Sequence, residues 1–208
     1  MTLIAVLDYE IGNLRSAQKA LEHVGADARL TTDLGLIREA AGVVLPGVGA
    51  FGRCMQALRR HGMDDVVLDV VERDVPFLGI CIGMQMLFER SEETASEPGL
   101  GVLPGTVRLL PDHVKRPQMQ WNVLERRGDP PLLADCPDPA WAYFVHSYAA
   151  DTDDVLVTST CDYGGPVVAS VGRGPVWATQ FHPEKSGRTG LAALAAFVRS
   201  AAAAQEAA

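Results

Sequence analysis

The first half of the chain alternates short apolar runs with amphipathic segments, and this alternation leaves few folds open. The apolar runs are nearly continuous, as in strands that are buried on both faces of a parallel sheet. The segments between them carry apolar residues at helical spacing, and the longest is interrupted near Gly62. The predicted strands are Leu3–Leu7, Ala26–Leu30, Gly42–Leu45 and Val75–Ile80, and the predicted helices are Leu14–Val24, Leu34–Ala41, Phe51–Arg73 and Met84–Ser91. The alternation indicates a doubly wound, mostly parallel sheet with helices on both faces, which binds ligands at the carboxyl ends of its strands.

The second half has a different character and adds β structure. Glu92–Gly105 is polar and contains Gly and Pro, so we expect a surface loop there. Leu191–Ala204 is rich in alanine and predicts a closing helix. Between them, short strands separated by turn residues are predicted at Val107–Leu110, Trp121–Leu124, Trp141–Val145, Val155–Thr160, Val167–Val171 and Val176–Phe181. We expect these strands to be antiparallel in part and to extend the same sheet, so that residues 1–208 form one α/β domain.

Composition narrows the classes of function. The formal net charge of −8 and the lack of a basic tract argue against nucleic-acid binding. The four cysteines, Cys54, Cys81, Cys136 and Cys161, include no Cys-x-x-Cys pair, so we expect neither a zinc site nor a disulfide framework. A reducing cytosol suits such a set of free thiols.

The N-terminal region predicts no targeting to a membrane. Leu3–Leu7 is too short for the apolar core of a signal peptide, no basic segment precedes it, and Asp8 follows at once. No apolar run approaches the length of a membrane span. We therefore expect a cytoplasmic protein without a membrane partner.

One cysteine lies where a predicted strand turns into a predicted helix, within Gly79-Ile80-Cys81-Ile82-Gly83. A sharp strand-to-helix turn exposes its central residue, and flanking glycines relieve the crowding. At a helix N-terminus the unpaired N–H groups favour a thiolate. The pattern predicts a nucleophile at Cys81.

A cysteine nucleophile needs a base, and the base needs a group that orients it. Of five histidines, His182 follows the apolar run that ends at Phe181, so it lies at a strand end near the predicted position of Cys81. Glu184 is two residues further, and its carboxylate could hold the imidazole in one tautomer. The set Cys81, His182 and Glu184 predicts a catalytic triad.

Acyl transfer also needs donors for a developing oxyanion. The backbone N–H of Ile82, directly after the nucleophile, is one candidate. The second could come from the Gly-rich segment Pro46-Gly47-Val48-Gly49 after the third strand, so Val48 and Gly49 are candidates.

Each of these features also has a structural explanation. A single cysteine or histidine at a strand end is more often a packed core residue than a catalytic one. His146 beside Ser147 could be a satisfied, half-buried pair, and His23, His61 and His113 fall in helix or loop positions that face solvent. The functional interpretation depends on several strand ends meeting at one edge of the sheet.

The same residues resemble a known family. Gly79-Ile80-Cys81-Ile82-Gly83-Met84-Gln85 together with Phe181-His182-Pro183-Glu184 is similar to the class I (triad-type) glutamine amidotransferases. The resemblance implies a flavodoxin-like sheet and hydrolysis of L-glutamine to glutamate and ammonia through a thioester on Cys81, with no cofactor and no metal. His182 would act as the base and Glu184 would orient it. The positions that would cradle glutamine are Gly49, Gly52, Gln85, His146, Ser147 and Tyr148.

Further motifs resemble one branch of that family, whose members form a heterodimer with a (β/α)₈ cyclase subunit in histidine biosynthesis. They include Asp8-Tyr9 with Gly12-Asn13-Leu14, the segment Tyr143–Tyr148, and Glu184-Lys185-Ser186-Gly187. This resemblance implies that ammonia passes to the cyclase. The positions that would face the cyclase are Asn13, Trp121, Tyr143 and Lys185.

One segment departs from the branch, and two alternatives stay open. Gln118 and Gln120 stand where the branch commonly has histidine and glycine, so a left-handed backbone at Gln120 would be strained. A related amidotransferase subunit serving another acceptor, in anthranilate or pyridoxal phosphate synthesis, is one alternative. A catalytically silent regulatory subunit of the same fold is the other.

Overall fold

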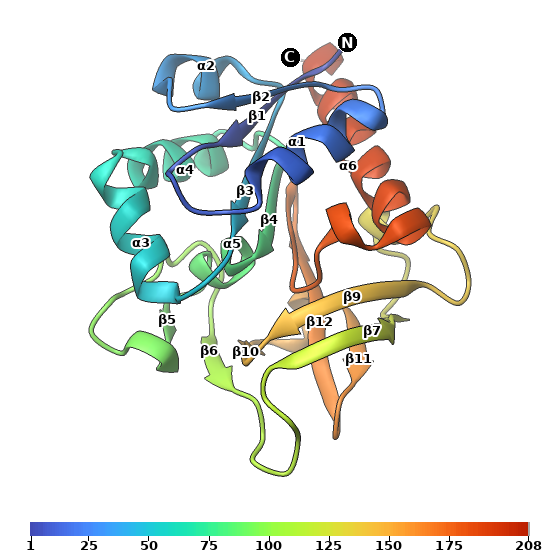
Figure 1. Cartoon of the computed structure of the whole chain (residues 1–208). Coiled ribbons are helices and arrows are strands. Elements are labelled where there is room, and N and C mark those ends of the chain that lie inside the picture. The colour runs from blue at the N-terminus through green and yellow to red at the C-terminus, as the bar shows by residue number, and fades with distance from the viewer. Residues whose placement is uncertain (208) are drawn as a thin grey trace.

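A large mixed β-sheet runs through the computed structural model, which describes residues 1–207 (Figure 1). The strand order is β2-β1-β3-β4-β13-β12-β11-β8. Neighbours from β2 to β13 pair in parallel, whereas β12, β11 and β8 pair antiparallel to their neighbours. In this order the strands are Asp27–Thr31, Leu3–Leu7, Gly42–Gly47, Phe77–Cys81, Val176–Thr179, Pro166–Arg173, Val157–Asp162 and Glu125–Arg126.

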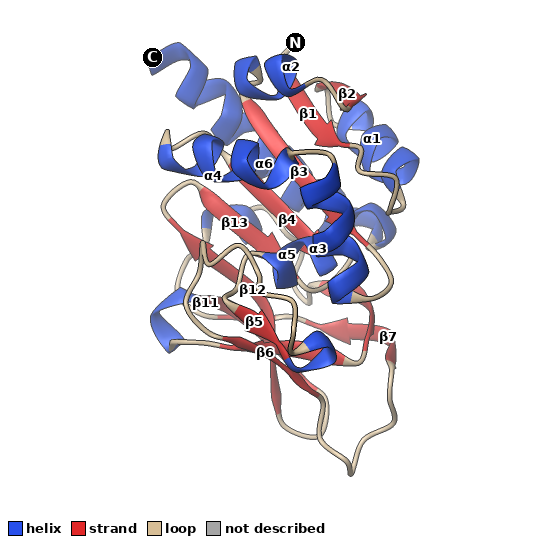
Figure 2. Cartoon of the chain, turned by 90° about the vertical axis from the view of Figure 1, so that its left-hand side faces the viewer, coloured by secondary structure: helices blue, strands red, loops and turns tan. Residues whose placement is uncertain are grey.

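Helices cover both faces of the parallel part of the sheet. Helices α1 and α6 pack together on one side, and α3, α4 and α5 lie on the other (Figures 1 and 2). Within residues 1–207, no helix has both the length and the apolar character needed to cross a membrane. The helices are α1 Leu14–His23, α2 Leu34–Glu39, α3 Phe51–Arg60, α4 Met63–Glu72, α5 Ile82–Met86 and α6 Gly187–Ala207.

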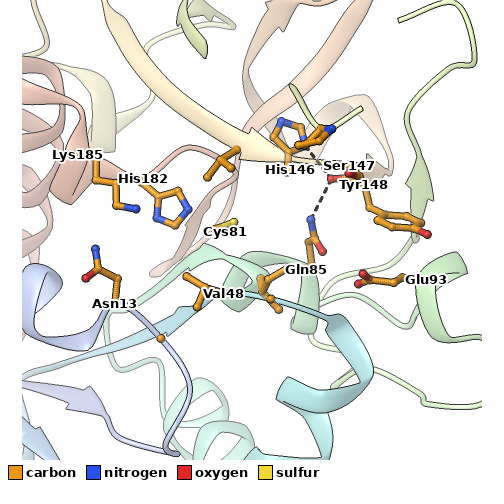
Figure 3. Close-up of a pocket in the computed structure, with 15 residues that line it drawn as sticks. Asn13, Val48, Cys81, Gln85, Glu93, His146, Ser147, Tyr148, His182 and Lys185 are labelled. Atoms are coloured by element: carbon orange, nitrogen blue, oxygen red, sulfur yellow. Dashed lines mark hydrogen bonds between the residues drawn. The ribbon is translucent and has the colours of Figure 1, made fainter. Parts of the chain in front are cut away.

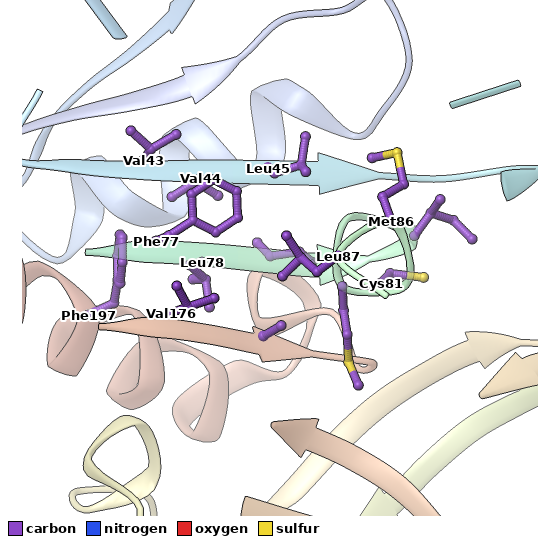
Figure 4. Packing of buried hydrophobic residues seen from close by; sticks show 14 of the residues in the cluster. Val43, Val44, Leu45, Phe77, Leu78, Cys81, Met86, Leu87, Val176 and Phe197 are labelled. Atoms are coloured by element: carbon purple, nitrogen blue, oxygen red, sulfur yellow. The ribbon is translucent and has the colours of Figure 1, made fainter. Parts of the chain in front are cut away.

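The core lies between the parallel strands and these helices. Every residue of β3 and of β4 is buried, as expected of strands covered on both faces. Val43 and Phe77 on neighbouring strands pack beside Val176 of β13 and Phe197 of α6 (Figure 4). Burying each such side chain contributes about 1.5–3 kcal/mol, so the core holds the strand ends in fixed positions.

Two smaller sheets lie beyond the carboxyl ends of the parallel strands, in the lower part of Figures 1 and 2. One contains β10, β6 and β5, and the other is an antiparallel pair of β7 and β9. Their bounds are β5 Arg90–Ser91, β6 Thr106–Leu109, β7 Gln118–Val123, β9 Trp141–His146 and β10 Tyr148–Asp151. They form a wall that faces the ends of β3, β4 and β13.

The predicted fold class is confirmed, and so is the interruption near Gly62. Gly62 has φ +62° and separates α3 from α4. The predicted helix Met84–Ser91 is wrong at both ends, because α5 begins at Ile82 and ends at Met86. The carbonyls of Met86, Leu87 and Phe88 accept N–H groups from residues 100–103 instead of continuing the helix.

The expectation that the second half extends one sheet is correct only in part. Strands β13, β12 and β11 do extend the large sheet, but β6, β7 and β9 lie in the two smaller sheets. Val155 belongs to a 3₁₀ turn, Asp154–Leu156, and β11 starts at Val157. The apolar pattern marks strands but not their partners, and each of these strands is short enough to pair in several ways.

Candidate active site

The chain turns sharply at Cys81, where β4 ends and α5 begins. Cys81 is the N-cap of α5 and has φ +55° and ψ −109°, a conformation that a non-glycine residue rarely adopts. The turn needs both of its glycines. A Cβ on Gly83 would lie 1.8 Å from the Leu45 carbonyl oxygen, and one on Gly79 would lie 2.9 Å from the Gly83 carbonyl oxygen. The backbone therefore forms the elbow that the sequence predicted.

His182 and Glu184 lie at the end of the neighbouring parallel strand. β13 ends at Thr179, and after His182 the 3₁₀ turn Pro183–Lys185 brings the carboxylate back to the imidazole. His182 Nδ1 lies 2.8 Å from Glu184 Oε1, and both side chains are at most 3% exposed. Because an ionised carboxylate only accepts hydrogen bonds, Nδ1 carries a proton and donates it. Nε2 makes no hydrogen bond, and the ring lies beside the Cys81 sulfur (Figure 3).

The charge state of His182 follows from its two neighbours. Burial lowers the pKa of His182, but the neighbouring Cys81 sulfur and the hydrogen-bonded Glu184 carboxylate outweigh burial and raise it to about 10. A raised pKa means that the imidazolium is stable next to a thiolate and a carboxylate. The geometry therefore suits transfer of the Cys81 proton to His182.

The Gly-rich segment after β3 lies beside the elbow. Gly47 pairs with Cys81, and a Cβ on Gly47 would lie 2.8 Å from the Gly83 nitrogen. The Pro46 carbonyl accepts the Tyr9 hydroxyl at 2.5 Å, and the Val48 carbonyl accepts the Cys54 thiol at 3.3 Å. Two hydrogen bonds from buried side chains thus hold this segment at the edge of the site.

A pocket of about 560 Å³ opens between these strand ends and the wall, in which β9 and β10 contribute lining residues (Figure 3). Its lining contains most of the residues that the sequence predicted, from five separate parts of the chain. The lining residues are Gly12, Asn13, Val48, Gly49, Cys81, Ile82, Gln85, Glu93, Pro117, Val145, His146, Ser147, Tyr148, His182 and Lys185.

Four predicted residues do not line the pocket. Glu184 lies behind His182. Gly52 lies in the first turn of α3 against the Thr94 side chain, which a Cβ would approach to 2.7 Å. Trp121 on β7 and Tyr143 on β9 form an edge-to-face pair, with ring centroids 6.0 Å apart.

His146 is held neutral at the pocket wall. Its Nδ1 donates to the Tyr148 carbonyl at 2.8 Å, since a carbonyl only accepts. Burial lowers the pKa of His146 to about 4, and the hydrogen bond to Tyr148 opposes this only in part. At neutral pH His146 is therefore uncharged, whereas the raised pKa of His182 favours its protonated form.

Sequence reasoning missed two residues of the site. Glu93 lines the pocket, and its carboxylate accepts the Phe51 N–H at 2.7 Å at the start of α3. Gln180 is fully buried and contacts Cys81. An amide inside an otherwise apolar strand was a signal for Gln180, whereas nothing in the loop after Ser91 marked Glu93.

The departures at Gln118 and Gln120 cause no backbone strain. Both lie in β7, where Gln118 pairs with His146 and Gln120 pairs with Phe144. Gln120 is not among the described non-glycine residues with positive φ, which are Glu10, Asp74 and Cys81. Gln118 is buried and donates to the Cys161 sulfur at 3.6 Å.

Comparisons with known proteins agree with this geometry. The model of the family described as "Glutamine amidotransferase class-I" matches residues 5–200. The chain is 49% identical over 200 residues to the imidazole glycerol phosphate synthase subunit HisH of Synechococcus sp. (strain JA-3-3Ab), covering 94% of this chain and 92% of that protein. It is 47% identical over 203 residues to the subunit of the same name from Deinococcus radiodurans, covering 96% and 94%.

Solved structures share the fold at lower identity. A crystal structure of a glutamine amidotransferase superposes with a TM-score of 0.76 at 22% identity, covering 96% of this chain and 98% of that one. The structure of PurLQS from Thermotoga maritima gives a TM-score of 0.74 at 21% identity, covering 96% and 99%. From the family match and these relatives, the chain belongs to the class I glutamine amidotransferases.

Proposed function

We propose that residues 1–208 are one glutaminase domain, the ammonia-producing subunit of an imidazole glycerol phosphate synthase. One observation carries this proposal: a buried thiol at a strained elbow lies beside an imidazole that a carboxylate orients, at the edge of a pocket. Relatives at 47% and 49% identity bear the name of that synthase subunit, and they cover more than nine tenths of the chain.

In the reactive state the proton of the Cys81 thiol has passed to His182 Nε2, which leaves a thiolate beside an imidazolium. The sulfur then attacks the side-chain amide carbon of L-glutamine, and a tetrahedral intermediate forms. When the C–N bond breaks, the imidazolium returns its proton to the leaving nitrogen, which departs as ammonia. Water, deprotonated by His182, then cleaves the thioester, and glutamate and the free thiol result.

Two backbone regions would stabilise the oxyanion. The N–H of Ile82 lies at the start of α5, where the amides have no partner within the helix. The second donor would come from the peptide unit of Val48 and Gly49, and Gly49 has φ +91°. Removing one such donor typically costs about 10²–10³ in rate.

Polar groups around the pocket would hold the amino acid. Gln85 presents a buried Oε1 without a partner, and the segment His146, Ser147 and Tyr148 supplies backbone groups on the opposite side. Gly49 belongs to this cradle. Gly52 would contribute indirectly, because a side chain there would displace Thr94.

The ammonia would pass to a (β/α)₈ cyclase subunit in a cytoplasmic heterodimer. The cyclase would use it to convert a phosphoribulosyl-formimino ribotide into imidazole glycerol phosphate and aminoimidazole carboxamide ribotide. Asn13 and Lys185 line the pocket next to His182 (Figure 3), and Trp121 and Tyr143 lie on the adjoining β7–β9 sheet. These four residues are the proposed contacts with the cyclase.

Replacement of the nucleophile tests this function. With the cyclase subunit present, Cys81→Ala should abolish glutamine-dependent turnover and leave ammonia-dependent turnover intact, because only the thioester step needs the thiol. Cys136→Ala is a matched control, since Cys136 is a buried thiol that donates to the Thr189 carbonyl. Unchanged use of glutamine in Cys81→Ala would falsify the triad, and co-purification with a chorismate-using partner would contradict the assignment to this synthase.

A further inference from the structure

Gln180 contacts the nucleophile but lies outside the pocket. It follows β13, and its backbone N–H donates to the Ala169 carbonyl at 2.8 Å. Its side chain is fully buried, and its Nε2 lies 3.6 Å from Cys81 Sγ. This distance is a normal hydrogen-bond length when sulfur is the acceptor. Gln180 takes no part in the proton transfers and bond changes of the proposed reaction.

A second buried amide lies behind Gln180. Gln85 Nε2 is 3.0 Å from Gln180 Oε1 and 3.0 Å from the Tyr148 carbonyl oxygen. Both hydrogens of this amino group are therefore used. Gln85 itself is 1% exposed and lines the pocket.

The Tyr148 carbonyl fixes the direction of the whole chain of hydrogen bonds. A backbone carbonyl only accepts, so Gln85 must turn its amino group toward Tyr148 and Gln180. Gln180 must then turn its oxygen toward Gln85 and its own amino group toward the sulfur. An inverted Gln85 would place its oxygen against two acceptors, and an inverted Gln180 would place its amino group against that of Gln85, so either inversion would leave buried groups unpaired.

We propose that Gln180 is a positioning residue for Cys81. The Tyr148 carbonyl fixes the orientation of Gln85, and Gln85 fixes that of Gln180, so that an N–H group of Gln180 always faces the sulfur. We call this chain of hydrogen bonds the relay. The sulfur receives a fixed N–H donor, which favours the thiolate over the thiol. Since the sulfur accepts from Gln180, its own hydrogen is directed elsewhere, toward the unpaired Nε2 of His182. This role deepens the proposed glutaminase function, on which it rests.

The relay acts among several titratable groups around the sulfur. His182, with Glu184 behind it, comes from the end of β13, whereas Tyr9 and Cys54 come from the segment after β1 and from α3. Gln180 is uncharged, so its contribution can be separated from theirs by a substitution that changes no charge.

Alkylation of Cys81 by iodoacetamide across pH provides the test in the full-length chain. Gln180→Met removes the donor and keeps the length of the side chain. We expect the midpoint of the pH profile to rise by about one pH unit and the rate below the midpoint to fall about tenfold. Cys81→Ser gives the background from the other cysteines, all of which are buried. Gln56→Met, an exposed amide of α3 that donates to Glu97, is the matched control and should not move the profile.

The relay itself is tested at Gln85, which does not hydrogen-bond to the sulfur. Gln85→Met frees the amide of Gln180 to rotate, so the midpoint should rise in the same direction. The double variant should shift no further than Gln180→Met alone, because both changes break one chain of contacts. Additive shifts would overturn the relay.

If folded Gln180→Met gives the same pH profile of alkylation as the wild type, the proposal is overturned. Should that variant fail to fold, Gln180→Leu also lacks the donor and adds no charge, and it must raise the midpoint as well. The assay uses neither glutamine nor the cyclase. If the variants shift the alkylation midpoint as expected but the wild type has no glutaminase activity, the proposed function is contradicted and the relay is not.

Discussion

At the residue scale, two histidines of one pocket differ in charge because their neighbours differ. His182 faces a thiol and a carboxylate, which raise its pKa, whereas His146 has only a backbone carbonyl as partner, and burial lowers its pKa. The pocket therefore contains one potential imidazolium beside the nucleophile and one neutral ring on the wall. This division supports the proposal that His182, and not His146, performs the acid–base chemistry.

His146 should make the protein sensitive to acid. Its folded-state pKa of about 4 lies below the ordinary 6.5, so the unfolded chain binds the extra proton first. The free energy of unfolding should then fall as the pH drops from about 6.5 to 4, by on the order of 3 kcal/mol from this group. Urea denaturation at several pH values, for the wild type and His146→Gln, measures the difference.

His23→Gln is the control for this measurement, since His23 is an exposed residue at the end of α1. Stability differences between wild type and His146→Gln that stay constant from pH 7 to pH 4 would contradict a neutral, buried His146. The His23 variant should follow the wild type throughout.

That Cys81, His182 and Glu184 lie together could be predicted from sequence because each of them has a local mark. Cys81 lies between glycines at a strand-to-helix turn, and His182 and Glu184 follow a strand with Pro183 between them. Gln180 is marked only as a polar residue in an apolar run, which does not reveal its proposed role, because that role depends on Gln85, which is 95 residues away in sequence, and on a backbone carbonyl. Contacts of this kind exist only once the sheet has formed.

At the element scale, the elbow depends on close packing of α5 against β3. The Leu45 carbonyl occupies the space that a Cβ on Gly83 would need. Only glycine lets the first turn of α5 approach β3 so closely, and this approach fixes the direction in which Cys81 leaves β4.

Gly83→Ala should therefore destabilise the protein strongly, by on the order of 4 kcal/mol, since backbone atoms of β3 or α5 must shift. Gly62→Ala is the matched control, because Gly62 has φ +62° but no atom within 4 Å of a Cβ position. It should cost only about 1 kcal/mol for the left-handed backbone. Urea midpoints measure both, and equal losses would show that the contact with Leu45 is not tight.

The elements themselves were predictable to different degrees. The parallel strands could be found because burial on both faces makes them continuously apolar, as in Val43, Val44 and Leu45. The end of α5 could not be predicted from sequence, because the carbonyls of Met86 to Phe88 accept hydrogen bonds from amides of a later loop. The separate β7–β9 pair was missed for a similar reason, because strand pairing depends on residues far apart in sequence.

At the scale of the whole molecule, one surface stands out beside the pocket. Met119 and Trp121 on β7 and Trp141 on β9 are large apolar residues that are 48–63% exposed. The pocket residues Asn13 and Lys185 are also among the proposed contacts with the cyclase. Aromatic side chains of this kind often carry much of the affinity of an interface.

Trp121→Glu should weaken binding to the cyclase at least about tenfold, because a charge would replace an aromatic side chain that the proposed complex buries. Leu68→Glu is the control, since Leu68 is 41% exposed on α4, which lies far from β7 in Figures 1 and 2. Titration calorimetry with the purified cyclase measures both affinities. Equal affinities for the two variants would place the cyclase on another surface.

The parallel pairing of β13 with β4 also bears on how the protein is made. Gln180 and Cys81 are separated by 99 residues, and His182 follows still later. A growing chain therefore presents its thiol long before His182, Glu184 and Gln180, the residues proposed to activate it, have been synthesised. We therefore expect glutamine to be consumed only by chains that have been completed and folded through their last strand.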